Sequence, residues 1–327
     1  MRDAIILLQP TLIASGIIFL VLAYSLWRRA DGTSSLRRRV RLVLSIALAV
    51  LGLGLLGTGA TLFWTMHRPR PKPVERILFE GIRYVREVRD TPRPLIVHTL
   101  VVDMTTPGIE FLVTPADPPR NGTLPARTTA RFLKEFNVQA AVNGDCFADC
   151  HTESVFDYYP KPGDPVHVLG NAASEGKTYA TSHRIDLTLF ISKANEARIG
   201  RAEGDVYNAI SGTHRILRHG VVTDDLPETI HPRTAAALDH DRKTLILMVI
   251  DGRQPRYSEG VTLQELARLL QDHGAYNAIN LDGGGSSSLV VEKKPGKTMR
   301  LNCPVHTGIP GRERPVANHL GIRARRP

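Results

Sequence analysis

The stretch Asn280 to Ser288, Asn-Leu-Asp-Gly-Gly-Gly-Ser-Ser-Ser, carries the residue types best suited to chemistry. Its carboxylate, Asp282, can accept a proton, and three glycines and three hydroxyls follow it. Consecutive glycines lose much backbone entropy on folding and bury little surface, so they indicate a place where the backbone comes close to a ligand. This composition favours a phosphate or a sugar as the ligand.

A strand, a helix and a second strand are predicted to position Asp282. The apolar run Thr244 to Ile250 predicts a buried strand that ends at Asp251. A threonine–glutamate capping box, apolar residues at helical spacing and a final glycine predict a helix within Thr262 to Gly274. Ala278 to Leu281 predicts the second strand, parallel to the first and near it. Asp251 and Asp282 are therefore expected at the same edge of one sheet.

An earlier segment repeats this arrangement. Ala130 to Phe136 predicts a helix, and Val138 to Val142 predicts a strand that ends in Asn143 and Gly144. In open α/β sheets, ligands bind beyond the carboxyl ends of the strands, where loops expose polar groups on rigid supports. We therefore expect these two residues to join the two aspartates in one crevice.

Cationic and hydroxyl side chains flank the same predicted strands. Guanidinium groups match phosphate oxygens bidentately, and a glycine-rich turn can present successive backbone N–H groups to an anion. The turn lacks the lysine of a nucleotide-binding P-loop. The predicted phosphate-binding residues are Arg233, Thr234, Arg253, Gly283, Gly284, Gly285, Ser286 and Ser287.

Two apolar segments near the N-terminus predict transmembrane helices, at about residues 4–27 and 42–65. A cleaved signal peptide is the alternative for the first, but its apolar run is longer than a signal core and a second span follows. The arginines between the spans favour a cytoplasmic loop, which places both chain ends outside. A basic cluster after the second span opposes this orientation. The predicted anchor is 1–66, with a Pro-rich spacer at 67–73 and the outer domain at 74–327.

The composition is that of a globular protein with added membrane segments, with 42% hydrophobic and 23% charged residues among 327. Much of the net charge of +10 comes from the clusters beside the spans and from the C-terminal tail. No nucleic-acid-binding motif accompanies it. Anionic lipid or an acidic envelope polymer is the expected partner of this charge.

The outer domain opens with strands, because Ile77 with Phe79, Pro94 to Val101 and Ile109 to Thr114 are apolar and rich in β-branched residues. Together with the helices predicted above, they favour an α+β fold. We expect a mixed β-sheet with flanking helices, preceded by the two transmembrane helices.

Three cysteines, Cys146, Cys150 and Cys303, allow one disulfide in an oxidising compartment, most simply Cys146 with Cys150. A metal site built from Cys146, Cys150 and His151 is the weaker alternative, since a lone Cys-x3-Cys spacing is poor evidence for one. The sequence requires no cofactor. Asp251 and Asp282 could nevertheless share a divalent cation as readily as a proton.

Six blocks of the chain, in the same order, resemble the phosphodiester glycosidase family, and they cover the region from about Val74 to the C-terminus. Asp145-Cys146-Phe147 departs from the family pattern, which has a small residue and then aromatic residues after Asn-Gly, so the sugar preference of the family is not carried over. The blocks are Ala140-Ala141-Val142-Asn143-Gly144, Ala209-Ile210-Ser211-Gly212 with Gly220, Arg233-Thr234-Ala235, Asp251-Gly252-Arg253, Asn280 to Ser287, and Asn318-His319-Leu320-Gly321.

The resemblance implies a hydrolase that cleaves the glycosidic bond of a sugar 1-phosphodiester in an envelope glycan or glycoconjugate. We then expect Asp282 to be the acid–base residue and Asp251 its partner or organiser, while Asn143 and Asn280 contact sugar or water. Asn318 lies in a matching block and joins the predicted binding residues. Two alternatives stay open, a phosphodiesterase that breaks the P–O bond and a non-catalytic envelope glycan-binding module.

Overall fold

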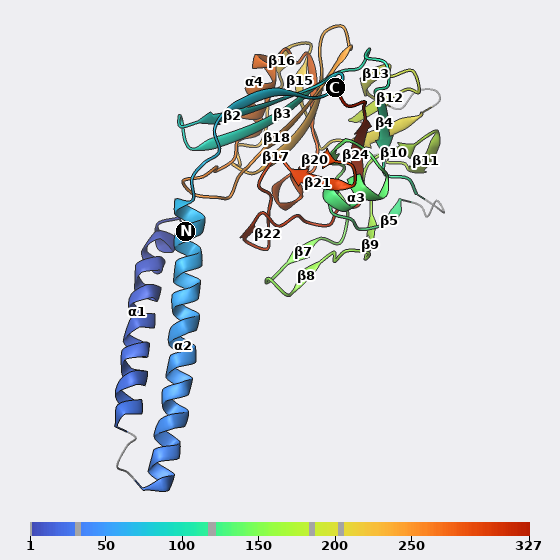
Figure 1. Cartoon of the computed structure of the whole chain (residues 1–327). Helices are drawn as coiled ribbons and strands as arrows, with labels where there is room; N and C mark the ends of the chain where they lie inside the picture. Colours follow the sequence, from blue (N-terminus) through green and yellow to red (C-terminus); the bar gives the residue numbers. More distant parts are fainter. Residues whose placement is uncertain (1, 30–33, 117–121, 183–186, 202–205) are drawn as a thin grey trace. The chain divides into compact units, whose positions relative to one another are not determined.

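The structure is a computed structural model that describes residues 2–29, 34–116, 122–182, 187–201 and 206–327 (Figure 1). The chain divides into two compact units, Met1–Pro69 and Arg70–Pro327. The first unit consists of two helices, and the second contains all of the predicted site residues.

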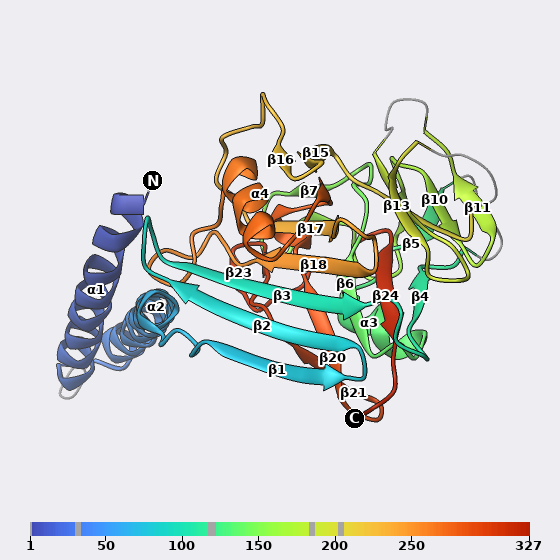
Figure 2. The same cartoon turned by 90° about the horizontal axis from the view of Figure 1, so that it is seen from above.

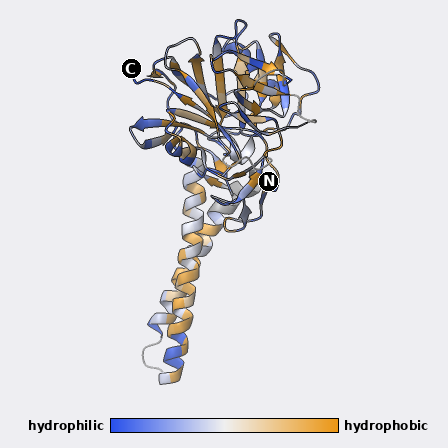
Figure 3. Ribbon diagram, turned by 90° about the vertical axis from the view of Figure 1, so that its right-hand side faces the viewer, coloured by the Kyte–Doolittle hydropathy of each residue, from blue (hydrophilic) through white to orange (hydrophobic). Residues whose placement is uncertain are grey.

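The N-terminal unit is a pair of long apolar helices, α1 (Arg2–Arg28) and α2 (Ser35–His67), which pack against each other. A Cβ on Gly16 would lie 2.9 Å from the carbonyl oxygen of Gly52, so glycine permits this close approach. The segments Pro10–Arg28 and Ser35–Thr65 have mean hydropathies of 1.8 and 2.3, and both helices are long and apolar enough to cross a membrane (Figure 3). Arg37 to Arg41, expected in a loop, lie instead in the first turns of α2.

The larger sheet of the second unit joins eight strands in the order β1-β2-β3-β18-β17-β19-β15-β16 within the described residues. Every neighbouring pair in it is antiparallel. The strands are β1 (Val74–Phe79), β2 (Ile82–Arg89), β3 (Leu95–Asp103), β15 (His214–Arg218), β16 (Val221–Val222), β17 (Arg233–Leu238), β18 (Thr244–Ile250) and β19 (Asn277–Asn280).

Two smaller sheets complete the framework, in the orders β21-β20-β6-β24-β4 and β11-β10-β14-β12-β13. The first contains β4 (Glu110–Val113), β6 (Ala140–Asn143), β20 (Leu289–Lys294), β21 (Lys297–Arg300) and β24 (His319–Arg323). The second contains β10 (Ala172–Ser174), β11 (Lys177–Ala180), β12 (Thr188–Ile191), β13 (Ala197–Gly200) and β14 (Asn208–Ser211).

Short hairpins and helices fill the connections between the sheets. Three two-stranded pairs are β5 (Thr123–Pro125) with β9 (Pro165–His167), β7 (His151–Thr152) with β8 (Tyr158–Tyr159), and β22 (Val305–His306) with β23 (Ile309–Pro310). The helices are α3 (Thr129–Glu135), α4 (Leu263–Asp272) and the 3-10 turn η1 (Gly284–Ser286). Helix α4 begins at the predicted capping box, in which Thr262 Oγ1 accepts from the Glu265 N–H at 3.1 Å and the Glu265 carboxylate accepts from the Thr262 N–H at 2.8 Å.

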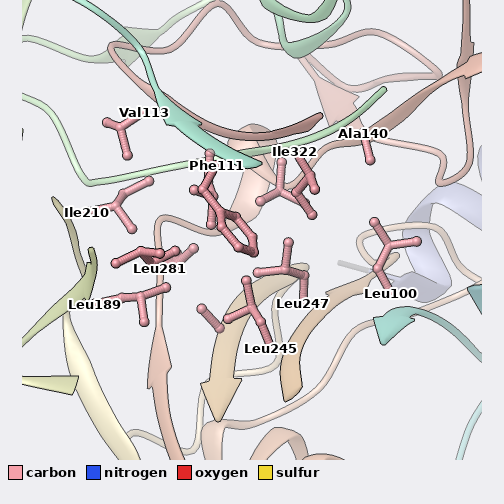
Figure 4. Close-up of a cluster of buried hydrophobic side chains, with 14 of the residues drawn as sticks. Leu100, Phe111, Val113, Ala140, Leu189, Ile210, Leu245, Leu247, Leu281 and Ile322 are labelled. Atoms are coloured by element: carbon pink, nitrogen blue, oxygen red, sulfur yellow. The ribbon is translucent and has the colours of Figure 1, made fainter. Parts of the chain in front are cut away.

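The core lies in layers on both faces of the larger sheet. On one face the apolar side of α4 packs over β17 and β18 (Figure 2). On the other, side chains such as Leu247 and Leu281 meet Phe111 and Ile210 from the smaller sheets (Figure 4). Helix α3 covers the outer side of β6 and β20 through Phe132. The strands that end at the predicted site are therefore held rigidly from both faces.

The predicted α+β class is confirmed, and the strands that precede Asp251 and Asp282 share a direction as expected, although they are not neighbours in the sheet. β18 and β19 run in the same direction, but β17 lies between them and pairs antiparallel with both. The Arg233–Leu238 segment, which was not predicted as a strand, takes the position beside β19. The expected sheet edge is nevertheless correct, because Asp251 and Asp282 follow the carboxyl ends of two strands with a common direction.

Candidate active site

Asp282 lies where the larger sheet meets β6 of the neighbouring sheet. Its N–H donates to the carbonyl of Gly144 at 3.0 Å, and its carbonyl accepts from Asn143 Nδ2 at 2.7 Å. The preceding residue, Leu281, donates its N–H to the carbonyl of Thr234 at 2.8 Å. Two strands thus fix the backbone of Asp282 from opposite sides, which sets the direction of its side chain.

The Asp282 carboxylate accepts two local hydrogen bonds. Oδ1 accepts from the Gly283 N–H at 2.9 Å and from the Cys146 thiol at 3.5 Å. Burial raises the pKa of Asp282, while the Ser286 side chain, the Arg314 charge and the Cys146 thiol oppose that rise. A carboxylate whose pKa is raised toward neutrality is suited to exchange protons with a reacting group.

Asn143 is a fully buried linker between the two sheets. Its Oδ1 accepts from Thr234 Oγ1 at 2.8 Å and from the Ser288 N–H at 3.1 Å. Its Nδ2 donates to the Asp282 carbonyl, so all three contacts are within the protein. Asn143 and Thr234, predicted as ligand contacts, therefore hold the Asp282 loop in place.

Asp251 is buried, with an exposed fraction of 1%, and Asn302 Nδ2 links it to the Asp282 loop by donating also to the Ser287 carbonyl at 3.0 Å. Its Oδ1 accepts from the Cys303 N–H at 2.8 Å and from Asn302 Nδ2 at 3.2 Å. Its Oδ2 lies 3.3 Å from His98 Nε2, and Tyr84 Oη lies 2.8 Å from Nδ1 of the same imidazole. These contacts satisfy both oxygens, which favours the organiser role over direct catalysis.

Substituting Asp251→Asn is expected to reduce stability more than turnover. Asparagine keeps the Oδ1 acceptor but replaces the charged partner of a buried network, which costs on the order of 1–3 kcal/mol in the free energy of unfolding. Urea denaturation of the variant, compared with kcat measured well below its melting temperature, tests this. A loss of kcat by orders of magnitude at unchanged stability would instead place Asp251 among the reacting groups.

Two guanidinium groups lie against the glycines of the Gly283–Ser287 loop. A Cβ on Gly284, which has φ +63°, would lie 2.9 Å from Arg253 Nη2, and a Cβ on Gly285 would lie 2.7 Å from Arg314 Nη2. Arg314 Nη1 also donates to Ser286 Oγ at 3.4 Å. Because Gly284 and Gly285 have no side chains, the two guanidinium groups can lie against the backbone of the loop. These two arginines and the loop beside Asp282 are named the Asp282 site below.

The N–H groups of the loop are mostly engaged within the protein, contrary to the expected anion cradle. The Gly283 N–H donates to Asp282 Oδ1, and the Gly284 N–H donates to the Pro232 carbonyl at 2.8 Å. The amides of Ser286 and Ser287 close turns onto Gly283 and Gly284 at 3.2 and 3.4 Å. An anion at this loop therefore depends on the guanidinium groups more than on the backbone.

Arg233 has a different place from the one predicted. Its Nη2 donates to the Thr229 carbonyl at 2.6 Å, and its Nε donates to the Val261 carbonyl at 3.3 Å. Burial and then the nearby Arg253 charge lower the pKa of Arg233. The Arg233 guanidinium is therefore bonded to backbone carbonyls of neighbouring segments, while Arg253 and Arg314 lie against the loop directly.

Gly144 and Asn318 contact each other beside Asp282. The Gly144 N–H donates to the Asn318 carbonyl at 3.0 Å, and the Asp145 N–H donates to Asn318 Oδ1 at 2.8 Å. A Cβ on Gly144 would lie 2.4 Å from Asn318 Oδ1, so only glycine fits there. Asn280 is also a local contact, because its Nδ2 donates to Thr213 Oγ1 at 2.8 Å and to the Leu281 carbonyl at 2.7 Å.

Asp145 brings a second carboxylate near Asp282. Its Oδ1 accepts from the Ser211 N–H at 2.7 Å, while its buried Oδ2 has no hydrogen-bond partner in the described residues. Burial raises the pKa of Asp145 well above its usual value, and the charge of Asp282 adds to the rise. Burial therefore favours the protonated form of this second carboxyl group beside Asp282.

The expected Cys146–Cys150 disulfide is not present, because Cys146 and Cys150 both have unbridged thiols. The Cys146 thiol faces Asp282 instead, and burial holds it in the neutral S–H form by raising its pKa. The described residues contain no group of three or more His, Cys, Asp or Glu side chains arranged to hold a metal. The Cys146, Cys150 and His151 set therefore does not form such a cluster.

Sequence reasoning missed Arg314 and the residues that hold it. Arg314 belongs to none of the motifs in the sequence, and its Nε donates at 3.4 Å to Nδ1 of His306, eight residues earlier in the chain. Burial and the charges of Arg314 and Arg312 lower the pKa of His306 to about 4, so this imidazole is neutral at pH 7. The only local signal is the pair of arginines in Arg312-Glu313-Arg314, which sequence alone cannot place beside the glycines.

A family model described as Phosphodiester glycosidase matches residues 136–323, more than half of the chain. The chain belongs to the phosphodiester glycosidase family. The matched range includes every element that builds the Asp282 site, from β6 to Arg314.

Individual relatives of this chain are distant. A prophage-derived uncharacterized protein of Bacillus subtilis (strain 168) is 25% identical over 273 residues, which cover 68% of this chain and 42% of the relative. The N-acetylglucosamine-1-phosphodiester alpha-N-acetylglucosaminidases of Bos taurus and Homo sapiens are each 30% identical over 151 residues, 38% of this chain and 28% of theirs. The chain thus spans less than half of the length of these curated relatives.

Solved structures share the fold. The zebrafish N-acetylglucosamine-1-phosphodiester alpha-N-acetylglucosaminidase catalytic domain, auto-inhibited by its pro-peptide, superposes with a TM-score of 0.53 at 22% identity, covering 80% of this chain and 86% of that one. A hypothetical protein from Synechocystis gives a TM-score of 0.57 at 15% identity, covering 78% and 64%. At these identities the likeness concerns the fold alone.

Proposed function

We propose that this protein is a hydrolase that cleaves the glycosidic bond of a sugar 1-phosphodiester in an envelope glycan or glycoconjugate. The supporting observation is the placement of Arg253 and Arg314 against the glycines that follow Asp282. A phosphodiester at this loop would have its negative charge beside two guanidiniums and its sugar carbon beside a carboxylate. Family membership supports the same class of substrate.

The proposed reaction needs little chemistry from the protein. Water attacks the anomeric carbon, its proton passes to the Asp282 carboxylate, and the bond from that carbon to the phosphate oxygen breaks. The phosphate leaves with the bonding electrons as a monoester, and Arg253 and Arg314 stabilise the charge that develops on it. Asn143, Gly144 and Thr234 hold the base in position.

Isotope-labelled water separates this proposal from its main rival. The full chain in detergent is incubated with a panel of sugar 1-phosphodiesters in oxygen-18 water. Label in the released sugar supports the glycosidase. Label in the phosphate would favour the phosphodiesterase, and binding without any product would favour the glycan-binding module.

The pH profile of turnover is expected to follow the raised pKa of Asp282. The base must be ionised, so kcat falls as the pH falls through this pKa, at a pH above the ordinary aspartate value of about 3.9. In Cys146→Ala the carboxylate loses a hydrogen-bond donor, its pKa rises further, and the acid limb moves to higher pH. Unchanged acid limbs in the two proteins would exclude Asp282 as the titrating group.

We further propose that residues 1–66 anchor the protein in the membrane as two spans, that 67–73 is a spacer, and that the 74–327 domain lies outside the cytoplasm. The apolar character of α1 and α2 and the arginines between their apolar segments support this topology. Alkaline phosphatase fused after Pro327 is active only when exported. An inactive fusion, with an active cytoplasmic reporter at the same position, would reverse the orientation.

A further inference from the structure

A cavity of about 530 Å³ lies at the opposite end of β19 from Asp282. Ile199 of β13 lines one wall, and Leu238 of β17 and Asn277 of β19 line the other, so the cavity lies between two sheets. Its volume is within the usual range for small-ligand sites. The remaining lining residues are all basic, namely Arg198, Arg201, Arg215, Arg218, His219 and Arg242.

The lining of this arginine cavity contains five guanidiniums and no carboxylate among the described residues. The acids in the turn that contains Arg242 are engaged elsewhere: Asp239 Oδ1 accepts from the Lys243 N–H at 2.9 Å, and Asp241 Oδ1 lies 3.0 Å from His240 Nδ1. Across the described residues, no ion pair joins Arg215, Arg218 or Arg242 to an acid. Their charge is therefore available to an anion.

The cations of the cavity also repel one another. Burial and then the charge of Arg218 lower the pKa of Arg215, which is half-buried in the wall of the cavity. Gathering like charges costs free energy unless a counter-ion offsets it. Guanidinium groups bind phosphate oxygens bidentately, so a phosphate group is the anion that this lining fits best.

Two neighbouring strands connect the arginine cavity with the Asp282 site. In their register His214 of β15 pairs with Asn280 of β19, close to Asp282, whereas Arg218 lies at the far end of β15. At about 3.3 Å per strand residue, the cavity lies roughly 15–20 Å from the Asp282 site. A phosphate in the cavity is thus a different group from the one at Asp282.

We infer that the arginine cavity binds a second phosphate group of the substrate, and that the substrate is a polymer in which phosphodiesters recur along the chain. This inference rests on the proposed function, since it takes one phosphodiester to lie at the Asp282 site. A polyanionic chain longer than the separation of the two sites can occupy both, whereas a single sugar 1-phosphodiester occupies only one.

The binding test uses the full chain in detergent micelles with Asp282→Asn, so that its outcome does not depend on turnover. Isothermal titration with inorganic pyrophosphate and with a glycerol phosphate polymer is compared between this protein and the same protein carrying R215Q and R218Q. Removing the two arginines is expected to weaken both ligands by at least about tenfold, since even one charged hydrogen bond contributes a factor of that size.

The matched control carries K293Q and K297Q. It removes the same two charges from the exposed β20–β21 hairpin. Its affinities are expected to change less than twofold, since exposed charges act weakly through solvent. Circular dichroism and melting temperature verify the fold of each variant. If R215Q/R218Q fails to fold, Arg242→Gln, in the exposed turn between β17 and β18, replaces it.

The kinetic test uses wild-type Asp282. R215Q/R218Q is expected to raise KM for the polymer about tenfold and to leave kcat and the KM of a small sugar 1-phosphodiester unchanged.

If R215Q/R218Q loses affinity for pyrophosphate but keeps its affinity for the polymer, the polymeric substrate is contradicted and free multivalent phosphate is the ligand of the cavity. Unchanged affinity for both would overturn the site. Absence of turnover on every substrate would contradict the proposed function, while the titrations still decide the cavity.

Discussion

Asp282→Asn is expected to lower kcat by about 10²–10⁴-fold, the usual contribution of a positioned acid–base group. Asparagine has nearly the same shape and keeps an Oδ1 acceptor for the Gly283 N–H, so the loop should remain in place. It cannot take a proton from water at neutral pH. The measurement is the initial rate of phosphate monoester release from a sugar 1-phosphodiester, with the melting temperature recorded for the same preparation.

Asp224→Asn is the matched control, because Asp224 is exposed and lies beyond β16, away from the Asp282 site. The same change of charge and shape at Asp224 should leave kcat within twofold of the native value. Native-like turnover by Asp282→Asn would exclude this carboxylate as the base and direct attention to Asp145, the neighbouring buried acid.

Asn143→Ala is expected to lower the free energy of unfolding by about 3 kcal/mol. The Thr234 hydroxyl, the Ser288 N–H and the Asp282 carbonyl would each lose a partner, and leaving a buried polar group unsatisfied costs about 1–3 kcal/mol. The change also frees the Asp282 backbone, so kcat should fall together with stability. Urea denaturation followed by circular dichroism measures the first effect and the rate assay the second.

Thr234→Val provides a graded comparison, since it removes only one hydrogen bond of the same network and keeps the volume of the side chain. Its expected cost is about 1 kcal/mol, with a small effect on kcat. Equal stabilities of Asn143→Ala and the native protein would show that the two sheets do not depend on this link.

The site loop could be predicted from sequence because its signal is local. Three glycines after an apolar strand and an acid are rare unless a ligand or a side chain approaches, and Arg253 and Arg314 do approach them. The role of Asp251 could not be predicted in the same way, because a carboxylate at a strand end gives the same pattern whether it faces ligand or is buried beside His98. That difference arises only from tertiary packing.

Long-range pairing explains the remaining differences. The placement of β17 between β18 and β19 depends on backbone hydrogen bonds that no periodicity encodes. Arg314 reaches the glycine loop from a segment about thirty residues further along the chain, so no spacing rule connects the two. The thiol of Cys146 was interpreted as half of a disulfide, because a Cys-x3-Cys pattern does not reveal that the thiol points at Asp282.

The position of Asp282 between β6 and β19 has a consequence for how the proposed activity can be lost. These strands belong to different sheets, and they meet only after residues from Ala140 to Asn318 have folded together. A fragment that contains only one of the two sheets would keep its sequence motifs but would lack the arrangement of Asp282 between β6 and β19. A substitution or deletion in a distant strand can therefore abolish the reaction while every residue of the loop is unchanged. An intact motif in a shorter relative does not by itself show that the relative is active.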